Sequence, residues 1–578
     1  IFTDYERQDT ETRRYTYMRK ISGNKLLVKA LREEGVDTLF GYPGACTIDI
    51  SDEIYKQDYT KVVLPRHEQA LVHAADAYAR STGKVGVCLV TSGPGATNLV
   101  TGIATANYDS VPLVCCTGQV ARHLIGNDAF QEVDIVGMTR SVTKYGVTVR
   151  RREDLGRIIK MAFYIASTGK PGPVLIDIPK DVTAKKAEYE KENPGVYNRE
   201  FTHIDEKEVA AAAEMIQASE KPFIFVGGGA ILSGASKELK EFVEKTDAPV
   251  TDSLMGKGAF PGTDPRYTGM LGMHGTKASN YGVSECDLLV VVGARFSDRV
   301  TGNTATFAKN AKILQIDIDP AEMNKNIIID QGVVGDIKAV LRKLNEVLPQ
   351  QDHAEWMKKI QDYKEKYPLK YHEGVLTGPF VVEEIYRQTK GDAIITTEVG
   401  QHQMWAAQYF KYTKPRTLLT SGGLGTMGYG LGAAIGAKTG CPDKTVINVA
   451  GDGCFRMNMN ELATAVRHEV PVIEVVINNH VLGMVRQWQD LFYDERYSAT
   501  VLRDAVDYVK LAEAMGAEGM RATTQEEFRE AFAKALASGR PVLIDCMIDC
   551  DDKVWPMVAP GAAISEAFDE QDLKEKNR

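Results

Sequence analysis

Strand-sized apolar runs alternate with helix-sized amphipathic stretches along almost the whole chain. The runs include residues 62–64, 223–226, 288–292, 445–449 and 472–477, in which Val, Ile, Leu and Phe predominate. Runs of this length are typical of buried strands, and their alternation with helical patterns indicates parallel sheets covered by helices. The chain is therefore predicted to be α/β, with doubly wound parallel sheets.

Two polar stretches interrupt this alternation and divide the chain. Residues 186–203 are charged and contain Pro and Gly, and residues 349–378 are polar around a short amphipathic helix, so both are interpreted as linkers. Residues 1–17 lack a starting Met, an apolar core and helical periodicity, and we interpret them as a disordered extension rather than a signal or transit peptide. The predicted domains are residues 18–185, 204–348 and 379–560, followed by a polar tail at 561–578.

The first and third predicted domains contain two similar segments, an internal repeat that we call the echo. Residues 89–114 and 448–473 each contain a strand, a Gly-x-Gly turn, a helix with an ATA-like segment, a Val-Pro pair and another strand, at spacings that agree within one residue. Self-similarity over this length predicts that the two domains are copies of one fold. Chance similarity between unrelated α/β segments is the alternative.

Composition and charge exclude several classes of function. The chain has 578 residues and a hydrophobic content of 44%. Its formal charge of −9 argues against a nucleic-acid or anionic-membrane surface. Its longest apolar runs are strand-sized, well short of the roughly 18 residues of a membrane span. The nine cysteines show no CxxC spacing, so we expect reduced thiols and a cytoplasmic location.

An acidic residue and an amide end two successive predicted strands. Asp452 lies in a Gly-Asp-Gly turn after residues 445–449, and Asn479 closes an Asn-Asn pair after residues 472–477. Such residues commonly serve only as turn formers. However, the carboxyl ends of adjacent parallel strands form ligand sites, and Mg²⁺ prefers oxygen ligands. The sequence therefore predicts a magnesium site, with Gly451 and Gly453 allowing close approach of a diphosphate.

These motifs resemble those of a known family. The Gly-Asp-Gly to Asn-Asn segment is similar to the fingerprint of thiamine-diphosphate (ThDP) enzymes. Residues 22–560 resemble the large catalytic subunits of the acetohydroxyacid synthase (acetolactate synthase) family through "FGYPGA", "LPRHEQALVHAADAYAR", "TSGPGATN", "GNDAFQEVDIVG", "LGMHGTKASN", "GARFSDRVTGN", "VGQHQMWAAQ" and "NNHVLGMVRQWQDLFY". The resemblance implies two related ThDP-binding domains on either side of a nucleotide-binding-like, FAD-binding middle domain.

The resemblance also implies a reaction. Pyruvate would be decarboxylated through a hydroxyethyl-ThDP carbanion, and this unit would condense with pyruvate or 2-oxobutyrate to give 2-acetolactate or 2-aceto-2-hydroxybutyrate, in branched-chain amino-acid biosynthesis. Glu68 would hydrogen-bond the aminopyrimidine ring of ThDP, whereas a Glu in a first helical turn is normally a surface residue that stabilises the helix dipole. Asp452, Asn479 and the Val481 carbonyl would bind Mg²⁺.

Further site residues are implied by the same resemblance. The ThDP contacts would be Tyr42, Pro43, Gly44, Pro94, Asn98, Val399, Gly400, Gln401, His402, Met427, Gly451, Gly453, Cys454, Met457, Leu482, Gly483 and Met484. The FAD contacts would be Gly227, Gly228, Gly229, Leu271, Gly272, Met273, His274, Gly293, Ala294, Arg295, Arg299, Val300, Asp317, Asp336, Gln403, Met404 and Gly422.

Substrate and partner expectations follow from the family as well. Arg299 would meet the carboxylate of the second 2-oxoacid, Trp488 would shape its pocket, and Gln131 and Lys180 would line the approach. Because Glu68 and Asp452 lie in different domains, the family pattern implies a site shared by two copies, hence a homodimer or homotetramer, with a separate small regulatory subunit. Ala45, Ala121, Lys170 and Ser297 depart from the family pattern.

Two alternatives remain open from the residues. One is another ThDP enzyme of similar layout, such as pyruvate oxidase, glyoxylate carboligase or a simple decarboxylase. The other is a flavin- or nucleotide-binding protein without carboligation, which would be expected to have a damaged Glu68 or Gly-Asp-Gly site. Both of those motifs are intact.

Overall fold

The computed structural model describes residues 18–190, 204–504 and 506–576. Within them are three six-stranded sheets in which all strand pairs are parallel, which confirms the predicted fold class. The chain forms two compact units, which we describe separately: residues 1–80 and 84–200, and residues 81–83 and 201–578. The predicted N-terminal extension lies outside the described residues.

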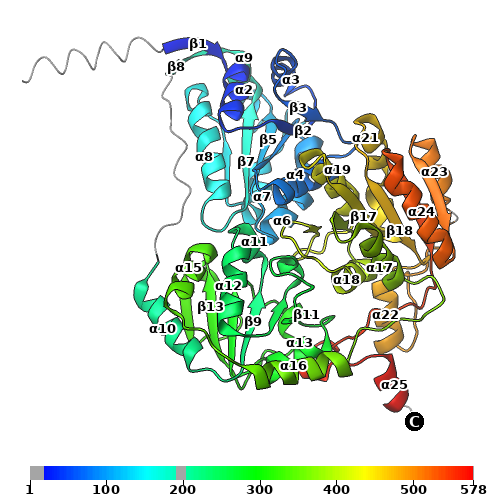
Figure 1. Ribbon diagram of the computed structural model, residues 1–578. Coiled ribbons are helices and arrows are strands. Elements are labelled where there is room, and N and C mark those ends of the chain that lie inside the picture. The colour runs from blue at the N-terminus through cyan, green and yellow to red at the C-terminus, as the bar shows by residue number, and fades with distance from the viewer. Residues whose placement is uncertain (1–17, 191–203, 505, 577–578) are drawn as a thin grey trace, which may run out of the picture. The chain divides into compact units, whose positions relative to one another are not determined.

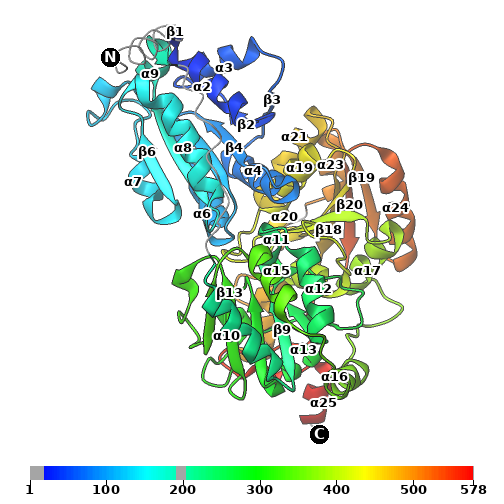
Figure 2. The same ribbon diagram turned by 60° about the vertical axis from the view of Figure 1, so that its left-hand side comes forward.

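The first unit contains a sheet with strand order β3-β2-β4-β5-β7-β6. Its strands β2, β3, β5 and β7 are labelled in Figure 1. Its core includes β4, β5 and β7, whose residues are all buried, and one face is covered by α2 (Gly23–Glu33) and α8 (Leu155–Ser167) (Figure 2). The strands are β2 (Thr38–Tyr42), β3 (Lys61–Val63), β4 (Gly86–Val90), β5 (Leu113–Gln119), β6 (Tyr145–Thr148) and β7 (Pro173–Pro179).

The remaining elements of the first unit connect these strands. The helices are α3 (Ile48–Tyr55), α4 (Glu68–Thr82), α5 (Pro94–Thr97), α6 (Val100–Tyr108), α7 (Ile135–Thr139) and α9 (Lys180–Ala184). In addition, β1 (Met18–Ser22) pairs antiparallel with β8 (Lys186–Glu190). The predicted linker at 186–203 therefore begins with a strand, because pairing with β1 gives this polar segment backbone partners that its sequence pattern does not reveal.

The second unit contains the middle sheet, with order β11-β10-β9-β12-β13-β14. The order reverses between β9 and β12, where doubly wound sheets bind nucleotides. Its strands and helices are β9 (Pro222–Val226), β10 (Val250–Asp252), β11 (Tyr267–Met270), β12 (Leu288–Val292), β13 (Lys312–Asp317), β14 (Gln331–Val334), α10 (Glu206–Gln217), α11 (Gly228–Leu232), α12 (Ser236–Thr246), α13 (Lys277–Glu285), α14 (Asp298–Thr301) and α15 (Ile337–Val347).

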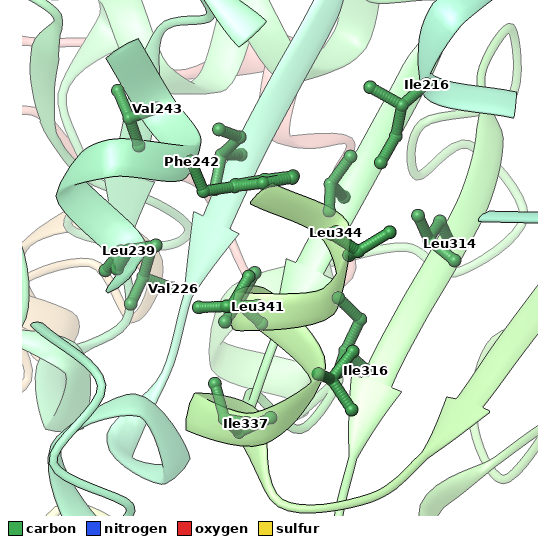
Figure 3. Close-up of a cluster of buried hydrophobic side chains, with 14 of the residues drawn as sticks. Ile216, Val226, Leu239, Phe242, Val243, Leu314, Ile316, Ile337, Leu341 and Leu344 are labelled. Atoms are coloured by element: carbon green, nitrogen blue, oxygen red, sulfur yellow. The ribbon is translucent and has the colours of Figure 1, made fainter. Parts of the chain in front are cut away.

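One core cluster joins this sheet to its helices. In Figure 3, Phe242 of α12 and Leu341 and Leu344 of α15 lie over the strands that carry Val226 and Ile316. Burial of each such side chain contributes about 1.5–3 kcal/mol to folding. The helix predicted inside residues 349–378 is α16 (Ala354–Lys366), which inserts Trp356 and Ile360 into a second cluster.

The second unit also contains the last sheet, with order β16-β15-β17-β18-β20-β19. If strands are counted from the first of each sheet, this order and that of the first unit are both 2-1-3-4-6-5, which confirms the echo. The elements are β15 (Ala393–Thr397), β16 (Leu418–Leu419), β17 (Thr445–Gly451), β18 (Ile473–Asn478), β19 (Glu518–Ala522), β20 (Val542–Met547), α17 (Gly378–Thr389), α18 (Gln401–Tyr409), α19 (Gly430–Gly440), α20 (Asp452–Asn458), α21 (Leu462–Arg467), α22 (Gly483–Phe492), α23 (Tyr508–Ala514), α24 (Gln525–Ser538) and α25 (Glu570–Lys576).

The predicted polar tail is anchored to the middle sheet. The buried Lys277 ammonium of α13 bonds the carboxylates of Asp569 and Asp572 at 2.7 and 2.5 Å. None of the helices formed by the described residues is long and apolar enough to cross a bilayer.

Candidate functional site

Asp452 is a buried carboxylate at the end of β17, as its position in the sequence predicted. Gly451 pairs with Ile477 of β18, so the ends of the two strands meet at one edge of the sheet. Asp452 is 1% exposed, and its Oδ2 has no hydrogen-bond partner among the described residues. Burial raises the Asp452 pKa to about 6, and the backbone N–H groups of Gly453 and His480 oppose that shift. A buried carboxylate oxygen that lacks a donor fits a hard cation.

Asn479 follows β18 and presents its side chain to the same edge. Its Nδ2 donates to Gln401 Oε1 at 3.3 Å, and its Oδ1 accepts the Val481 N–H at 3.2 Å. His480, between them, has a left-handed φ of 56°. This bend turns the chain after the strand, so Asn479 and Val481 belong to one tight loop beside the Asp452 carboxyl.

Glycines bring the other predicted diphosphate contacts together. A Cβ at Gly451 would lie 2.8 Å from His402 Nδ1, and one at Gly483 would lie 2.0 Å from Gln401 Oε1. The His402 Nε2 is buried and has no partner among the described residues, and burial lowers the pKa of this imidazole to about 3. His402 is therefore a neutral ring with one unsatisfied nitrogen at this edge.

The apolar residues predicted around ThDP lie on the same loops. Leu482 packs against Gly453, whose Cβ would lie 2.6 Å from Leu482 Cδ2. Cys454 is buried and donates to the Val399 carbonyl at 3.0 Å, whereas Met457 is 55% exposed and contacts Gly428. Met427 and Met484 are half-buried, and Gly400 precedes α18.

Glu398 is a further residue at this edge of the sheet, and it was not among the residues predicted from the sequence. Glu398 follows β15 and is 1% exposed. Its carboxylate accepts the backbone N–H groups of Gly428 at 2.7 Å and Gly430 at 2.9 Å, and thus caps the start of α19 next to Met427. Burial raises the Glu398 pKa to about 7, against these hydrogen bonds. Its position, a carboxylate directly after a strand, is the same signal that identified Asp452.

In the first unit, Glu68 opens α4 as predicted. Asn98 Nδ2 donates to Glu68 Oε2 at 2.9 Å. The other oxygen, Oε1, lies 3.5 Å from the position that a Cβ would take at Gly95. One carboxylate oxygen is therefore fixed by an amide, and the other faces the turn that follows β4.

The remaining predicted residues of the first unit follow its strand ends. Lys180 Nζ donates to the Ala45 carbonyl at 2.9 Å, and a Cβ at Gly44 would lie 2.5 Å from Thr91 Cβ. Gln131 has a left-handed φ of 61° and packs against Gly93, which precedes Pro94. Tyr42, the last residue of β2, and Pro43, which follows it, are exposed. These residues and Glu68 thus gather near the carboxyl ends of β2, β4 and β7.

In the middle sheet, the predicted FAD glycines meet at the switch point. Gly229 N–H donates to the Gly293 carbonyl at 2.9 Å, and a Cβ at Gly227 would lie 2.4 Å from the Cα of Ala294. Contact between these two loops therefore requires the glycines, independently of any bound group. Gly228 faces Met255, with 3.3 Å between that Met Cβ and a Cβ built on the glycine.

The other predicted FAD contacts have varied local partners. A Cβ at Gly272 would lie 2.3 Å from the Arg299 carbonyl, and the Met273 N–H donates to the same carbonyl at 2.8 Å. Buried His274 has a pKa lowered by burial to about 4, and its Nδ1 has no partner among the described residues. Leu271, Ala294 and Val300 are buried, Arg295 and Met404 are half-buried, Gln403 donates to Thr420 at 2.7 Å, and Gly422 contacts Met255.

Two predicted contacts have capping roles in the structure. Asp336 is the N-cap of α15, where it accepts the Ala339 N–H at 3.1 Å. Asp317 accepts the Asp319 N–H at 2.9 Å at the end of β13. Their carboxylates are therefore partly occupied by local turns.

Arg299 and Trp488 lie together, although the chain separates them widely. The Arg299 guanidinium carbon is 5.8 Å from the centre of the Trp488 ring, and the Arg side chain is 63% exposed. The guanidinium also pairs with the Asp298 carboxylate at 3.4 Å. The contact with the aromatic face itself uses none of the guanidinium N–H donors. Arg299 comes from α14 and Trp488 from α22.

Comparison with known proteins identifies the class first. Three family models match: the N-terminal TPP (thiamine pyrophosphate) binding domain of thiamine pyrophosphate enzymes at residues 21–138, their central domain at 209–344 and their C-terminal TPP binding domain at 398–546. Together with the paired sheets of identical order, these matches define a thiamine-diphosphate enzyme.

Individual relatives narrow the class. The chain is 48% identical to the acetolactate synthase large subunit of Parasynechococcus marenigrum, over 94% of this chain and 90% of that protein. It is 44% identical to the large subunit of Haemophilus influenzae over 97% and 100%, and 45% identical to isozyme 2 of Escherichia coli over 95% and 100%. The chain belongs to the acetolactate synthase large-subunit family.

Proposed function

We propose that the chain is the catalytic subunit of an acetohydroxyacid synthase. It decarboxylates pyruvate and joins the remaining two-carbon unit to a second 2-oxoacid, giving 2-acetolactate from pyruvate and 2-aceto-2-hydroxybutyrate from 2-oxobutyrate. Family membership over nearly the whole chain supports the reaction. The observation that carries the chemistry is the buried, unpartnered Asp452 oxygen beside the loop of Asn479.

The residues of this edge fit ThDP and Mg²⁺. Asp452, Asn479 and the Val481 carbonyl would hold the cation, while Gln401, His402 and Gly451 would face the diphosphate. Bound ThDP supplies an electron sink for loss of CO₂ and for formation of the new carbon–carbon bond. Two buried polar atoms, on Asp452 and His402, have no hydrogen-bond partner in the described parts of the chain, and this supports the assignment.

Glu68 would act on the proton of the cofactor's pyrimidine ring. The Asn98 amide orients the Glu68 carboxylate through Oε2, which leaves Oε1 to share a proton with a ring nitrogen. Because Glu68 belongs to the first unit and Asp452 to the second, we propose that a second copy of the chain supplies Glu68 to each site.

We further propose that FAD binds at the switch point of the middle sheet. The strand order, the loops after β9 and β12 and the unpartnered His274 Nδ1 support a nucleotide there. The synthase reaction has no net redox change, so the flavin would have a structural role.

Arg299 and Trp488 would receive the second 2-oxoacid. Arg299 would pair its exposed guanidinium with the substrate carboxylate, and the adjacent Trp488 ring would limit the size of the acceptor's alkyl group.

Partners and compartment complete the proposal. A separate small subunit is supported by the printed names of the relatives, which are large subunits. All nine cysteines are free, and six of them are buried, which supports the reducing cytoplasm.

Product analysis tests the proposed function. Purified protein is incubated with pyruvate, ThDP and Mg²⁺, with and without FAD and 2-oxobutyrate, and the products are identified by mass. We expect 2-acetolactate from pyruvate alone, and 2-aceto-2-hydroxybutyrate as the main product when 2-oxobutyrate is added.

Other products would change the assignment. Acetaldehyde or acetate alone would keep a ThDP enzyme and reject carboligation. Absence of both cofactor binding and turnover would reject the proposed site itself.

A further inference from the structure

Helix α22 buries a glutamine more completely than any of its apolar side chains. Gln487 is 1% exposed and is the one buried residue of α22, whereas Met484 and Trp488 are half-buried, Val485 is 51% exposed and Phe492 is 38% exposed. Burial of a side-chain amide costs free energy unless its donors and acceptor are satisfied. An ordinary surface helix buries its apolar residues most deeply, so the buried amide needs an explanation.

Gln487 uses both ends of its amide. Its Oε1 accepts the Val554 N–H at 2.9 Å and the Gln401 Nε2 at 3.0 Å. Its Nε2 donates to the Val554 carbonyl at 3.1 Å. The side chain thus joins α22 to the backbone after β20 and to the start of α18.

The Gln401 amide continues this chain of hydrogen bonds to the cation loop. Gln401 Nε2 also donates to the Asp552 carbonyl at 2.8 Å, and Gln401 Oε1 accepts Asn479 Nδ2 at 3.3 Å. Gly483 lies against this amide pair, with a Cβ position 2.8 Å from Asn479 Nδ2. Three amides, Gln487, Gln401 and Asn479, are therefore connected in one line.

The hydrogen bonds fix which end of each of the three amides faces its neighbour. Because Gln487 offers its oxygen to Gln401, Gln401 must present its NH₂ group to Gln487 and its oxygen to Asn479. Asn479 must then present its own NH₂ group to Gln401, which leaves its oxygen on the opposite side. The orientation of the Asn479 amide, and so the atom available to a cation, is specified from α22 through Gln401 as well as by the Val481 N–H that the Asn479 oxygen accepts.

Attachment of α22 alone does not require Gln487. Arg486 pairs with Asp551 at 2.8 Å and Lys553 with Asp490 at 3.1 Å, so ion pairs on both sides of Gln487 hold the helix to residues 551–553. The buried amide adds polarity and direction to a contact that already exists.

We propose that Gln487 is a positioning residue that orients the Asn479 oxygen toward the cation through Gln401, and that it couples occupancy of the cation site to the placement of α22. This inference rests on the proposed ThDP–Mg²⁺ site. By reciprocity, an ion that favours one orientation of Asn479 also favours the docked position of the helix that carries Trp488.

Calorimetric titration of Mg²⁺ at saturating ThDP tests the inference. Gln487→Met keeps the side-chain length but removes the hydrogen bonds of the amide to Val554, Gln401 and the Met557 sulfur. We expect Mg²⁺ to bind about 10–100-fold more weakly, the range typical of residues that support metal ligands. The matched control is Gln489→Met on the same helix, because Gln489 bonds Ser498 and Thr500 rather than Gln401. The control is expected to bind Mg²⁺ like the unaltered protein.

A double variant distinguishes positioning from general stabilisation. If Gln487 acts through Gln401, Gln487→Met causes no further loss of Mg²⁺ affinity in a Gln401→Met background. Hydrogen exchange at Val554 gives a second readout, because Mg²⁺–ThDP is expected to slow exchange in the unaltered protein and in Gln489→Met but not in Gln487→Met.

Three results would overturn the inference. They are equal Mg²⁺ affinity in Gln487→Met and the unaltered protein, additive losses in the double variant, and, if Gln487→Met fails to fold, a Gln487→Asn protein that folds and keeps full affinity despite its shorter reach. If the unaltered protein itself binds no Mg²⁺–ThDP, the proposed function falls and this inference falls with it.

Discussion

The hydrogen bond between Asn98 and Glu68 bears on which of two roles this carboxylate has. Asn98 fixes one oxygen of Glu68 at 2.9 Å, and the second oxygen faces the turn at Gly95. A surface glutamate that only stabilised the helix dipole would be expected to keep both oxygens in solvent. This geometry supports the proposed role of Glu68 in proton transfer.

Glu68→Gln keeps the size of the side chain but removes the proton acceptor. We expect kcat for acetolactate formation to fall about 10²–10⁴-fold, the usual contribution of general acid–base catalysis, with little change in ThDP affinity. Glu53→Gln is the control, because Glu53 lies on α3 and accepts a hydrogen bond from Gln57 rather than from Asn98. Turnover by Glu68→Gln at the rate of the control would refute the assigned role.

Gly483→Ala tests the amide pair beneath the cation loop. The new Cβ would lie 2.0 Å from Gln401 Oε1, so the Gln401–Asn479 hydrogen bond must break or the loop must move. We expect Mg²⁺–ThDP affinity, measured by calorimetry, to fall more than about tenfold, the loss seen when support of a metal ligand is removed. Gly41→Ala, where the nearest atoms are 3.5 Å away, should bind normally, and normal binding by both variants would contradict the geometry.

Residues at strand ends could be predicted from the sequence, but those inside helical patterns could not. Asp452 and Asn479 were found because a polar residue directly after an apolar run is a local signal. Gln487 sits at an apolar-stripe position between Met484 and Trp488, and only the tertiary contact with Val554 shows that this position is buried. The Asp336 carboxylate, predicted from resemblance, proved to cap a helix.

At the scale of elements, α4 contains a buried histidine that makes stability depend on pH. His73 is fully buried in the middle of this helix, and burial lowers its pKa from 6.5 to about 3. A base with a lowered folded-state pKa takes up its proton only on unfolding. Its contribution to stability is therefore complete above pH 6.5 and is lost as the pH falls toward 3.

His73→Leu removes this titration while keeping a buried side chain of similar size. Each pH unit below 6.5 costs the unaltered protein up to about 1.4 kcal/mol from this group. We expect the melting temperature of the variant, relative to the unaltered protein, to rise as the pH is lowered from 7 to 5. A difference in melting temperature that stays constant over this interval would show that His73 is not the titrating group.

Parallel sheets were predictable as elements because buried strands are continuous apolar runs. Strand order was not, with one exception: the echo of residues 89–114 in 448–473 predicted a shared fold, and the common order 2-1-3-4-6-5 confirms it. The pairing of β1 with β8 was missed because both strands are short and polar, so only their mutual backbone hydrogen bonds identify them.

At the scale of the whole molecule, we propose that each site takes residues from two copies of the chain. Glu68 and Asp452 lie in separate compact units of the chain. If the two residues of a site come from different copies, a variant that lacks Glu68 and a variant that lacks Asp452 can restore activity when they pair. They cannot do so if both residues come from the same copy.

Co-expression of Glu68→Gln with Asp452→Asn tests this arrangement. Random pairing should give half mixed dimers, each with one intact site, and so about a quarter of the unaltered activity. Each variant expressed alone should be nearly inactive. Absence of recovery, with mixed dimers verified by mass spectrometry, would place both residues in one chain's site.

The Glu398 carboxylate affects which loop of this sheet edge is open to an anion. Its two oxygens already accept the backbone N–H groups of Gly428 and Gly430 at the start of α19, so these donors are engaged within the chain. A phosphate that diffuses into this region would find them occupied, because the N–H groups that bind anions at a helix start already have an acceptor here. We therefore expect a cation-bound diphosphate to use the neighbouring loop of Asp452 instead.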